Sequence, residues 1–213
     1  MKQERLGALA DGIFAIVMTL LVFDIRVPHI DGVLTDATVW QGIATLAPLF
    51  LSYLLSFALL FTYWRSHHYI VSVLAKNIDI PLSNLSALFF FFVGLVPFST
   101  YLLGTYSMTH IAVAIFSLNI ICLGLSLYIM RRYVIRSHDV DNNPYTTLEN
   151  AHANSRILVP VISAVVAYFV SYINIDIALF LFTVAIIFNL SRRSTRYLFK
   201  AFGFFFVTPE AVD

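Results

Sequence analysis

The residue with the clearest chemical potential is a lone carboxylate in the first apolar stretch of the chain, residues 5–28. Asp11 is the only charge between Leu6 and Phe23, in a run long enough to span a bilayer as a helix. A carboxylate at the centre of a spanning helix costs roughly 2.5–3.5 kcal/mol on insertion scales. Asp11 is therefore expected near one end of the helix, or facing protein or water rather than lipid.

A second face of this helix is apolar. At about 100° per residue, Ile16, Leu20 and Phe23 fall within about 60° of one another, and Thr19 lies on the flank of that stripe. Asp11 lies roughly 140° away from Ile16 around the helix axis. The helix is therefore expected to have two roles, on two different faces.

Arg5 and Asp11 cannot neutralise each other within this helix. They lie about 120° apart around its axis, which rules out a bridge between residues i and i+4. Each charge must therefore find a partner elsewhere. Two interpretations remain open: a flanking arginine of the positive-inside kind with a carboxylate satisfied in the bundle interior, or a network that holds helices together.

Paired histidines, His67 and His68, raise the question of a metal or acid-base site. Adjacent residues on a helix point about 100° apart, and the chain has no Glu-His spacing of the zincin kind. No metal and no other cofactor is therefore expected. An enzyme would have to use Asp11, His67 and His68, and no nucleophile with a matched base can be placed near them.

The composition indicates that these residues belong to a membrane protein. Apolar side chains make up 60% of the chain, charged ones 12%, and the mean hydropathy is +0.85, whereas about 25% of residues are charged in soluble proteins. An all-α, polytopic membrane protein in a lipid bilayer is the expected class. The formal net charge of +1 does not suggest nucleic acid as a partner. The single cysteine, Cys122, excludes an intrachain disulfide.

Six transmembrane helices are predicted in a single domain that takes up residues 1–213. Their approximate bounds are 6–26, 39–64, 80–103, 107–130, 147–174 and 176–200. Asn174 and Asp176 are expected to form a tight turn, because one uninterrupted helix there would overshoot the bilayer. Pro97 is expected to kink the third helix. Trp40 and Trp64 should place one indole at each membrane interface of the second helix.

The basic residues predict the orientation of these helices. Of the 13 lysines and arginines, only Arg26 falls on the side of the membrane opposite to the others. Short cytoplasmic loops carry an excess of such residues. Both the N-terminus and the C-terminus are therefore predicted to be cytoplasmic, in a multi-pass protein of the cell membrane.

Residues of the first helix also follow a recognisable register. They are Arg5, Asp11, Gly12, Phe14, Ala15, Ile16, Thr19, Leu20 and Leu21. The same register, with a Phe-Ser pair where this chain has Leu9 and Ala10, occurs in the prokaryotic branch of the endosomal and lysosomal potassium channel family, which the helix resembles. Trp64 and His67 match a tryptophan of that family and a histidine three residues later. Asn84 and the pair Pro97-Phe98 also resemble the family.

The resemblance implies an oligomeric pore. It implies a homotetramer, because a chain with one six-helix repeat needs further copies to bring first helices to a common axis. The resemblance selects Ile16 as the narrowest ring and gate. The helical projection adds Leu20 and Phe23 to the pore lining, with Thr19 hydroxyls beside them. The candidates for a structural network near the cytoplasmic end are Arg5, Asp11, Trp64, His67 and Asn84.

The implied function is a leak-like channel for monovalent cations, with K⁺ preferred. The chain has no Thr-Val-Gly-Tyr-Gly loop, so a preference for K⁺ must come from apolar rings and Thr19 hydroxyls, and selectivity should be modest. Two alternatives remain open. A secondary transporter of a small ion or solute would show paired broken half-helices in repeated positions, and Pro97 alone is no such pair. The second alternative is a membrane-embedded enzyme.

Overall fold

The regular elements of the described chain are all helices. The structure, a computed structural model, describes residues 2–30, 32–137, 140 and 147–190, and in the last range the side chains from Ala153 to Ala185. The elements are α1 (Gln3–Leu20), the 3-10 helix η1 (Leu21–Asp24), α2 (Asp36–Ala44), α3 (Ala47–His68), the π-helix η2 (Tyr69–Leu74), α4 (Ile80–Gly94), α5 (Val96–Thr105), α6 (His110–Arg136), α7 (Thr147–Ser171) and α8 (Ile175–Leu190).

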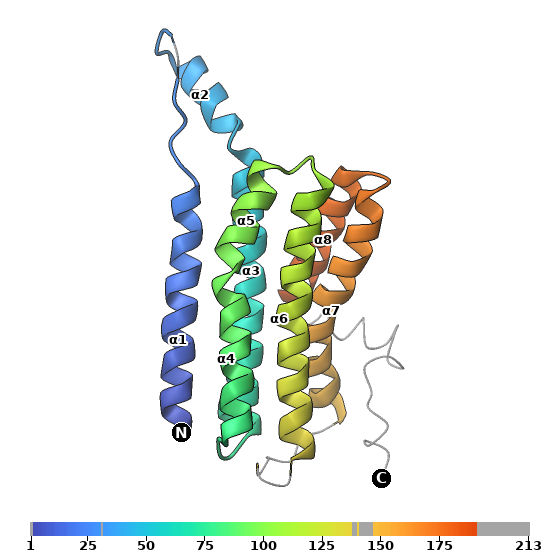
Figure 1. Ribbon diagram of the computed structural model, residues 1–213. Helices are drawn as coiled ribbons and strands as arrows, with labels where there is room; N and C mark the ends of the chain where they lie inside the picture. The colour runs from blue at the N-terminus through green and yellow to red at the C-terminus, as the bar shows by residue number, and fades with distance from the viewer. Residues whose placement is uncertain (1, 31, 138–139, 141–146, 191–213) are drawn as a thin grey trace.

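These helices run side by side along one axis. In Figure 1, α1 lies at one side of the bundle, α4 and α5 lie next to it with α3 behind them, and α6, α7 and α8 complete the other side. Small polar side chains join the inner helices, because hydroxyl and amide groups at membrane depth need partners. Thr100 Oγ1 donates to Ser56 Oγ at 2.6 Å, and Asn119 Nδ2 donates to Ser99 Oγ at 3.0 Å. The all-helical fold of a membrane protein is confirmed.

Five helical stretches in the described chain are long and apolar enough to cross a bilayer. They are Gln3–Asp24, Ala47–Leu74, Ile80–Thr105, His110–Arg136 and Ala153–Ser171. The sixth expected span, α8, has 16 residues, about 24 Å of helix against about 30 Å of hydrocarbon. A sixth crossing therefore stays a prediction.

The prediction of one helix over 39–64 is wrong. That segment is divided between α2 and α3, because Pro48 near the start of α3 has no N–H with which to continue the preceding helix. Trp40 lies on α2, an element without buried residues that projects from one end of the bundle in Figure 1. Trp40 and Trp64 therefore do not mark the two ends of one helix.

The predicted kink in the third segment is confirmed. Here α4 ends at Gly94 and α5 begins at Val96, with Pro97 in the first turn of α5. Proline cannot donate a backbone hydrogen bond to the preceding turn, so the helix is interrupted there. The predicted turn near Asn174 is confirmed as well, since Asn174 Oδ1 accepts a hydrogen bond of 3.0 Å from Ile177 N at the start of α8.

Other helix ends differ from the predicted ones by a few residues. The first helix ends at Asp24 instead of 26, because its last turn is a 3-10 turn. The fourth predicted helix continues to Arg136 instead of 130. Buried Arg131 supports this extension, since it donates a hydrogen bond to Asn154 Oδ1 of α7. The predicted part of the last helix at 191–200 lies outside the described residues.

Close helix packing at α6 depends on one glycine. A Cβ at Gly124 would lie 2.1 Å from Cγ2 of Val161 on α7 and 3.0 Å from the hydroxyl of Tyr63 on α3. Real Cβ contacts are never this short, so only glycine lets these backbones approach. Gly124 thereby positions α3 and α7 against α6.

Candidate functional site

One face of α1 is buried against the bundle. Its buried residues are Leu6, Ala10, Phe14, Val17 and, in η1, Leu21. The ring of Phe14 lies 5.9 Å from that of Phe89 on α4. This face holds α1 to α3, α4 and η2 through apolar contacts, so the remaining faces of α1 point away from the core.

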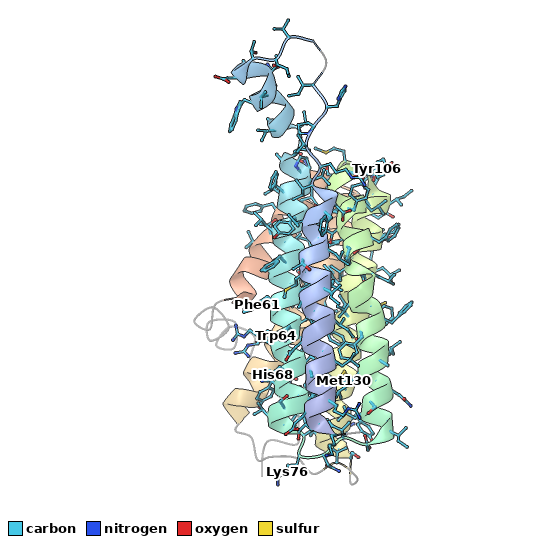
Figure 2. The ribbon with its side chains drawn as sticks, turned by 90° about the vertical axis from the view of Figure 1, so that its left-hand side faces the viewer. Phe61, Trp64, His68, Lys76, Tyr106 and Met130 are labelled. Atoms are coloured by element: carbon cyan, nitrogen blue, oxygen red, sulfur yellow. The ribbon has the colours of Figure 1, made fainter. Side chains whose placement is uncertain are left out.

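The predicted stripe lies on such an outward face. Ile16 is 60% exposed, Leu20 45% and Phe23 71%. Figure 2 looks onto this side of the bundle, and α1 lies in front of the other helices. Within one subunit, therefore, the apolar stripe is not covered by the described part of the chain.

The hydroxyl of Thr19 is already engaged with its own helix. Thr19 Oγ1 donates to the carbonyl oxygens of Ala15 at 2.8 Å and of Ile16 at 2.9 Å. A hydroxyl carries one donor and two acceptor lone pairs. With its proton directed to the backbone, the exposed oxygen of Thr19 can offer lone pairs to a cation but no proton to an anion.

Asp11 is bound by α3. The indole Nε1 of Trp64 donates a hydrogen bond of 2.8 Å to Asp11 Oδ1. The indole also stacks on His68 at a ring distance of 6.0 Å and lies 5.7 Å from the ring of Phe61. Figure 2 shows Phe61, Trp64 and His68 in succession along α3, beside α1. Neighbouring rings thus support the orientation in which Trp64 reaches the carboxylate.

The other expected network residues are placed differently. His67 is buried and stacks on Phe89 at 5.4 Å with an angle of 9° between the rings. Arg5 and Asn84 are both exposed, on α1 and α4. The structure joins Asp11 and Trp64 by a direct hydrogen bond. Among the described residues, none of the other three candidates is hydrogen-bonded to that pair, although His67 lies close enough to Asp11 for an electrostatic interaction.

A contact without any signal in the sequence holds the start of α1. Gln3 Nε2 donates to the carbonyl oxygens of Val71 at 2.6 Å and of Ala75 at 3.1 Å, at the end of the π-helix η2. A π-helix leaves carbonyl groups in positions that a regular α-helix does not provide. Nothing in the local sequence marks Tyr69–Leu74 as a π-helix, so this anchor could not be predicted.

The described residues contain no group of three or more His, Cys, Asp or Glu side chains placed to hold a metal ion. The site therefore consists of a hydrogen bond from Trp64 of α3 to Asp11 of α1, and of an apolar stripe and a hydroxyl oxygen on α1. Such an arrangement can orient a helix and line a passage, and it offers no set of groups for bond-making chemistry.

Comparison with known proteins places this helix in a wider context. Residues 5–97 match the family described as the endosomal/lysosomal potassium channel TMEM175. A protein of Streptomyces collinus named a potassium channel is 31% identical over 140 residues, which make up 64% of this chain and 66% of that protein. A similarly named protein of a Chryseobacterium species is 30% identical over 137 residues, or 64% of this chain and 67% of that protein. The chain thus spans about two thirds of the length of these relatives.

A solved structure has the same fold. It is the crystal structure of a lysosomal potassium-selective channel TMEM175 homolog from Chamaesiphon minutus. It superposes with a TM-score of 0.72 at 25% sequence identity and covers 90% of this chain and 97% of that chain. The structural similarity therefore extends well beyond residues 5–97, which match the family.

Proposed function

Because this chain belongs to the endosomal/lysosomal potassium channel TMEM175 family, we propose that it is a cation channel permeable to K⁺, with a pore lined by α1. The observation that carries the proposal is the uncovered stripe of Ile16, Leu20 and Phe23. The matched region, residues 5–97, includes all of this helix except its first two residues. The names of the family and of its relatives are those of ion channels, not of enzymes.

The pore needs more than one copy of the chain. A cyclic arrangement of four subunits would bring four copies of α1 to one axis and cover the apolar stripe that a single subunit exposes. The hydrogen bond from Trp64 to Asp11 supports this geometry, because it acts on the flank of α1 and leaves the Ile16 face free. The oligomer proposed here is a homotetramer.

The stripe would act as a hydrophobic constriction. A cation that enters a ring of Ile16 side chains loses hydration water and meets no compensating dipoles, so an apolar ring resists ion passage. Leu20 and Phe23 extend the apolar zone, and the oxygen of Thr19 offers lone pairs next to it. The flux is expected to be leak-like and its preference for K⁺ modest, because apolar rings coordinate no ion.

The proposed orientation has both chain ends in the cytoplasm of a cell whose surface membrane holds the protein. In Figure 1, the end of α3, the loop before α4, the end of α6 and the start of α7 lie toward the end of the bundle that carries the N-terminus, and the segment after α1 lies toward the other end. In the described chain, the first group of segments carries Arg65, Lys76, Arg136 and Arg156, and the segment after α1 carries Arg26. The excess of basic residues at one end supports a cytoplasmic location for that end.

A channel and a transporter differ in what a K⁺ gradient does across a vesicle membrane. Purified protein is placed in liposomes with K⁺ inside and Na⁺ outside, and a voltage-sensitive dye reports the potential. A K⁺-preferring channel should create an inside-negative potential without added ionophore, and the purified particle should have the mass of four chains. A monomer, or K⁺ loss that occurs only with counter-transport and no potential, contradicts the proposal and favours the transporter.

A further inference from the structure

The cytoplasmic end of α6 carries a groove that the channel proposal does not use. Its volume is about 410 Å³, and it is lined by Tyr128, Ile129, Arg132, Tyr133, Arg136 and Ser137. All of these residues belong to the last turns of α6 or follow it directly. Among the described residues that line it, two guanidinium groups are combined with apolar surface.

The groove lies at the level of lipid headgroups. With 27 residues, α6 is about 40 Å long, whereas the hydrocarbon core of a bilayer measures about 30 Å. Part of α6 therefore extends beyond the hydrocarbon, and the last turns are the favoured part because they carry Arg132 and Arg136. In Figure 2, Lys76 marks this end of the bundle, and Met130 of α6 lies on the same half.

One exposed face of α6 changes from apolar to basic as it enters the groove. Leu118, Leu125, Ile129, Arg132 and Arg136 fall within about 60° of one another at about 100° per residue. The first three are large exposed apolar residues, and the last two line the groove. This series of residues is called here the α6 stripe. Its apolar residues could contact the acyl chain of a phospholipid, and its two arginines the headgroup.

Tyr133 forms a fixed wall of the groove. Its hydroxyl donates a hydrogen bond to Oδ2 of Asp79, and Oδ1 of Asp79 accepts 2.9 Å from Leu82 N at the start of α4. Both oxygens of Asp79 therefore accept hydrogen bonds, one of them from Tyr133. Tyr128 and Ile129 supply the apolar surface between the arginines and the hydrocarbon.

From these features we propose that the α6 stripe binds one anionic phospholipid. Its phosphate contacts the guanidinium groups of Arg132 and Arg136, and one acyl chain lies along Ile129, Leu125 and Leu118. Guanidinium groups pair with phosphate oxygens through two parallel hydrogen bonds. In a zwitterionic lipid, the positive charge of the headgroup repels the arginines and weakens this pairing. A soluble anion would make no contact with the apolar half of the stripe, whereas a lipid contacts both halves.

Lipid retention measured by native mass spectrometry tests the site without any ion flux. The purified protein is titrated with dioleoylphosphatidylglycerol or with dioleoylphosphatidylcholine, and bound lipids are counted on the intact particle. The parent should retain the anionic lipid more strongly. Arg132→Gln should weaken that retention about fivefold, the equivalent of about 1 kcal/mol for one basic residue near anionic lipid. Arg132→Gln with Arg136→Gln should remove the preference.

Lys76→Gln is the matched control, because Lys76 is exposed at the same end of the bundle but lies outside the groove. It should leave retention within about twofold of the parent. An equal loss in Lys76→Gln, equal retention of both lipids by the parent, or displacement of the lipid by excess inorganic phosphate would each overturn the proposal. So would a disulfide between subunits in a Leu125→Cys, Cys122→Ser variant, since a second copy would then cover the stripe. If the double variant does not assemble, Arg132→Gln alone decides.

Discussion

The indole Nε1 of Trp64 lies 2.8 Å from Oδ1 of Asp11 and donates a hydrogen bond to it across the interface of α1 and α3. Asp11 and Ile16 are roughly 140° apart around α1. A bond that holds Asp11 against α3 therefore also determines where Ile16 points. Together with the buried face of Phe14, it turns the apolar stripe of α1 away from the bundle.

Trp64→Phe should destabilise the protein while it keeps an aromatic ring beside His68. The substitution removes the only donor that the indole has, at a cost of about 1.5 kcal/mol for a hydrogen bond to a charged group. Unfolding in detergent, followed by intrinsic fluorescence or circular dichroism, measures the loss. In the Trp64→Phe background, Asp11→Ala should cost much less than in the parent. Equal costs in both backgrounds would show that the two residues are not coupled.

Thr19→Val should lower K⁺ flux or weaken the preference for K⁺ over Na⁺ without a change in assembly. Valine has the same shape but no oxygen, so the lone pairs that Thr19 presents beside the stripe are lost. The comparison uses ion substitution in liposomes that contain equal amounts of parent and variant. Thr19→Ser, which keeps the oxygen, is the control and should behave like the parent; a Val variant with unaltered flux and preference would exclude the hydroxyl from permeation.

Gly124→Ala should destabilise the contact between α6 and α7 by about 1–3 kcal/mol, the usual cost of overpacking. The new Cβ would lie 2.1 Å from Val161 Cγ2. Adding Val161→Ala removes that methyl group and should restore part of the lost thermal stability. Gly94→Ala is the control, because a Cβ there meets nothing within 4 Å. A Gly124→Ala protein as stable as Gly94→Ala would show that the two helices are less closely packed than described.

Single cysteines should identify the two sides of the membrane. Ala37 on α2 and Asn77 before α4 are both exposed. In Figure 1, α2 and the start of α4 lie at opposite ends of the bundle. With Cys122→Ser as background, an impermeant maleimide should label Ala37→Cys in intact cells and Asn77→Cys only after lysis. Labelling of Asn77→Cys in intact cells would reverse the proposed orientation, and labelling of both would contradict the described arrangement of the helices.

The sequence predicted the spans well where one helix carries a long apolar run. Two prolines, Pro48 and Pro97, interrupt such runs, and only the effect of Pro97 is predicted from the sequence. Pro97 predicts a kink because it interrupts an apolar run, and the kink is confirmed. Pro48 lies in an equally apolar context, and its effect depends on α2 leaving the bundle, a tertiary choice that local hydropathy does not encode.

The candidate site could be predicted only in part. Periodicity alone places Ile16, Leu20 and Phe23 on one face, and their exposure on a common side of the bundle agrees with it. The partner of Asp11 is 53 residues away in the chain. Residue types alone are compatible with several partners, and only the packing of the helices selects Trp64. The same holds for Gln3, whose partners lie on a π-helix that has no sequence signature.

The central claim is that the Ile16 face of α1 lines a closed apolar constriction. The most direct test compares K⁺ flux from liposomes that contain parent, Ile16→Asn or Ile162→Asn protein in equal amounts. Ile162 lies on α7 and is 51% exposed, so its variant carries the same substitution at a similarly exposed site away from α1. An amide in the constriction should admit water and raise resting flux in Ile16→Asn, whereas Ile162→Asn should match the parent. Equal flux from all three proteins would contradict the claim and remove Ile16 from the pore.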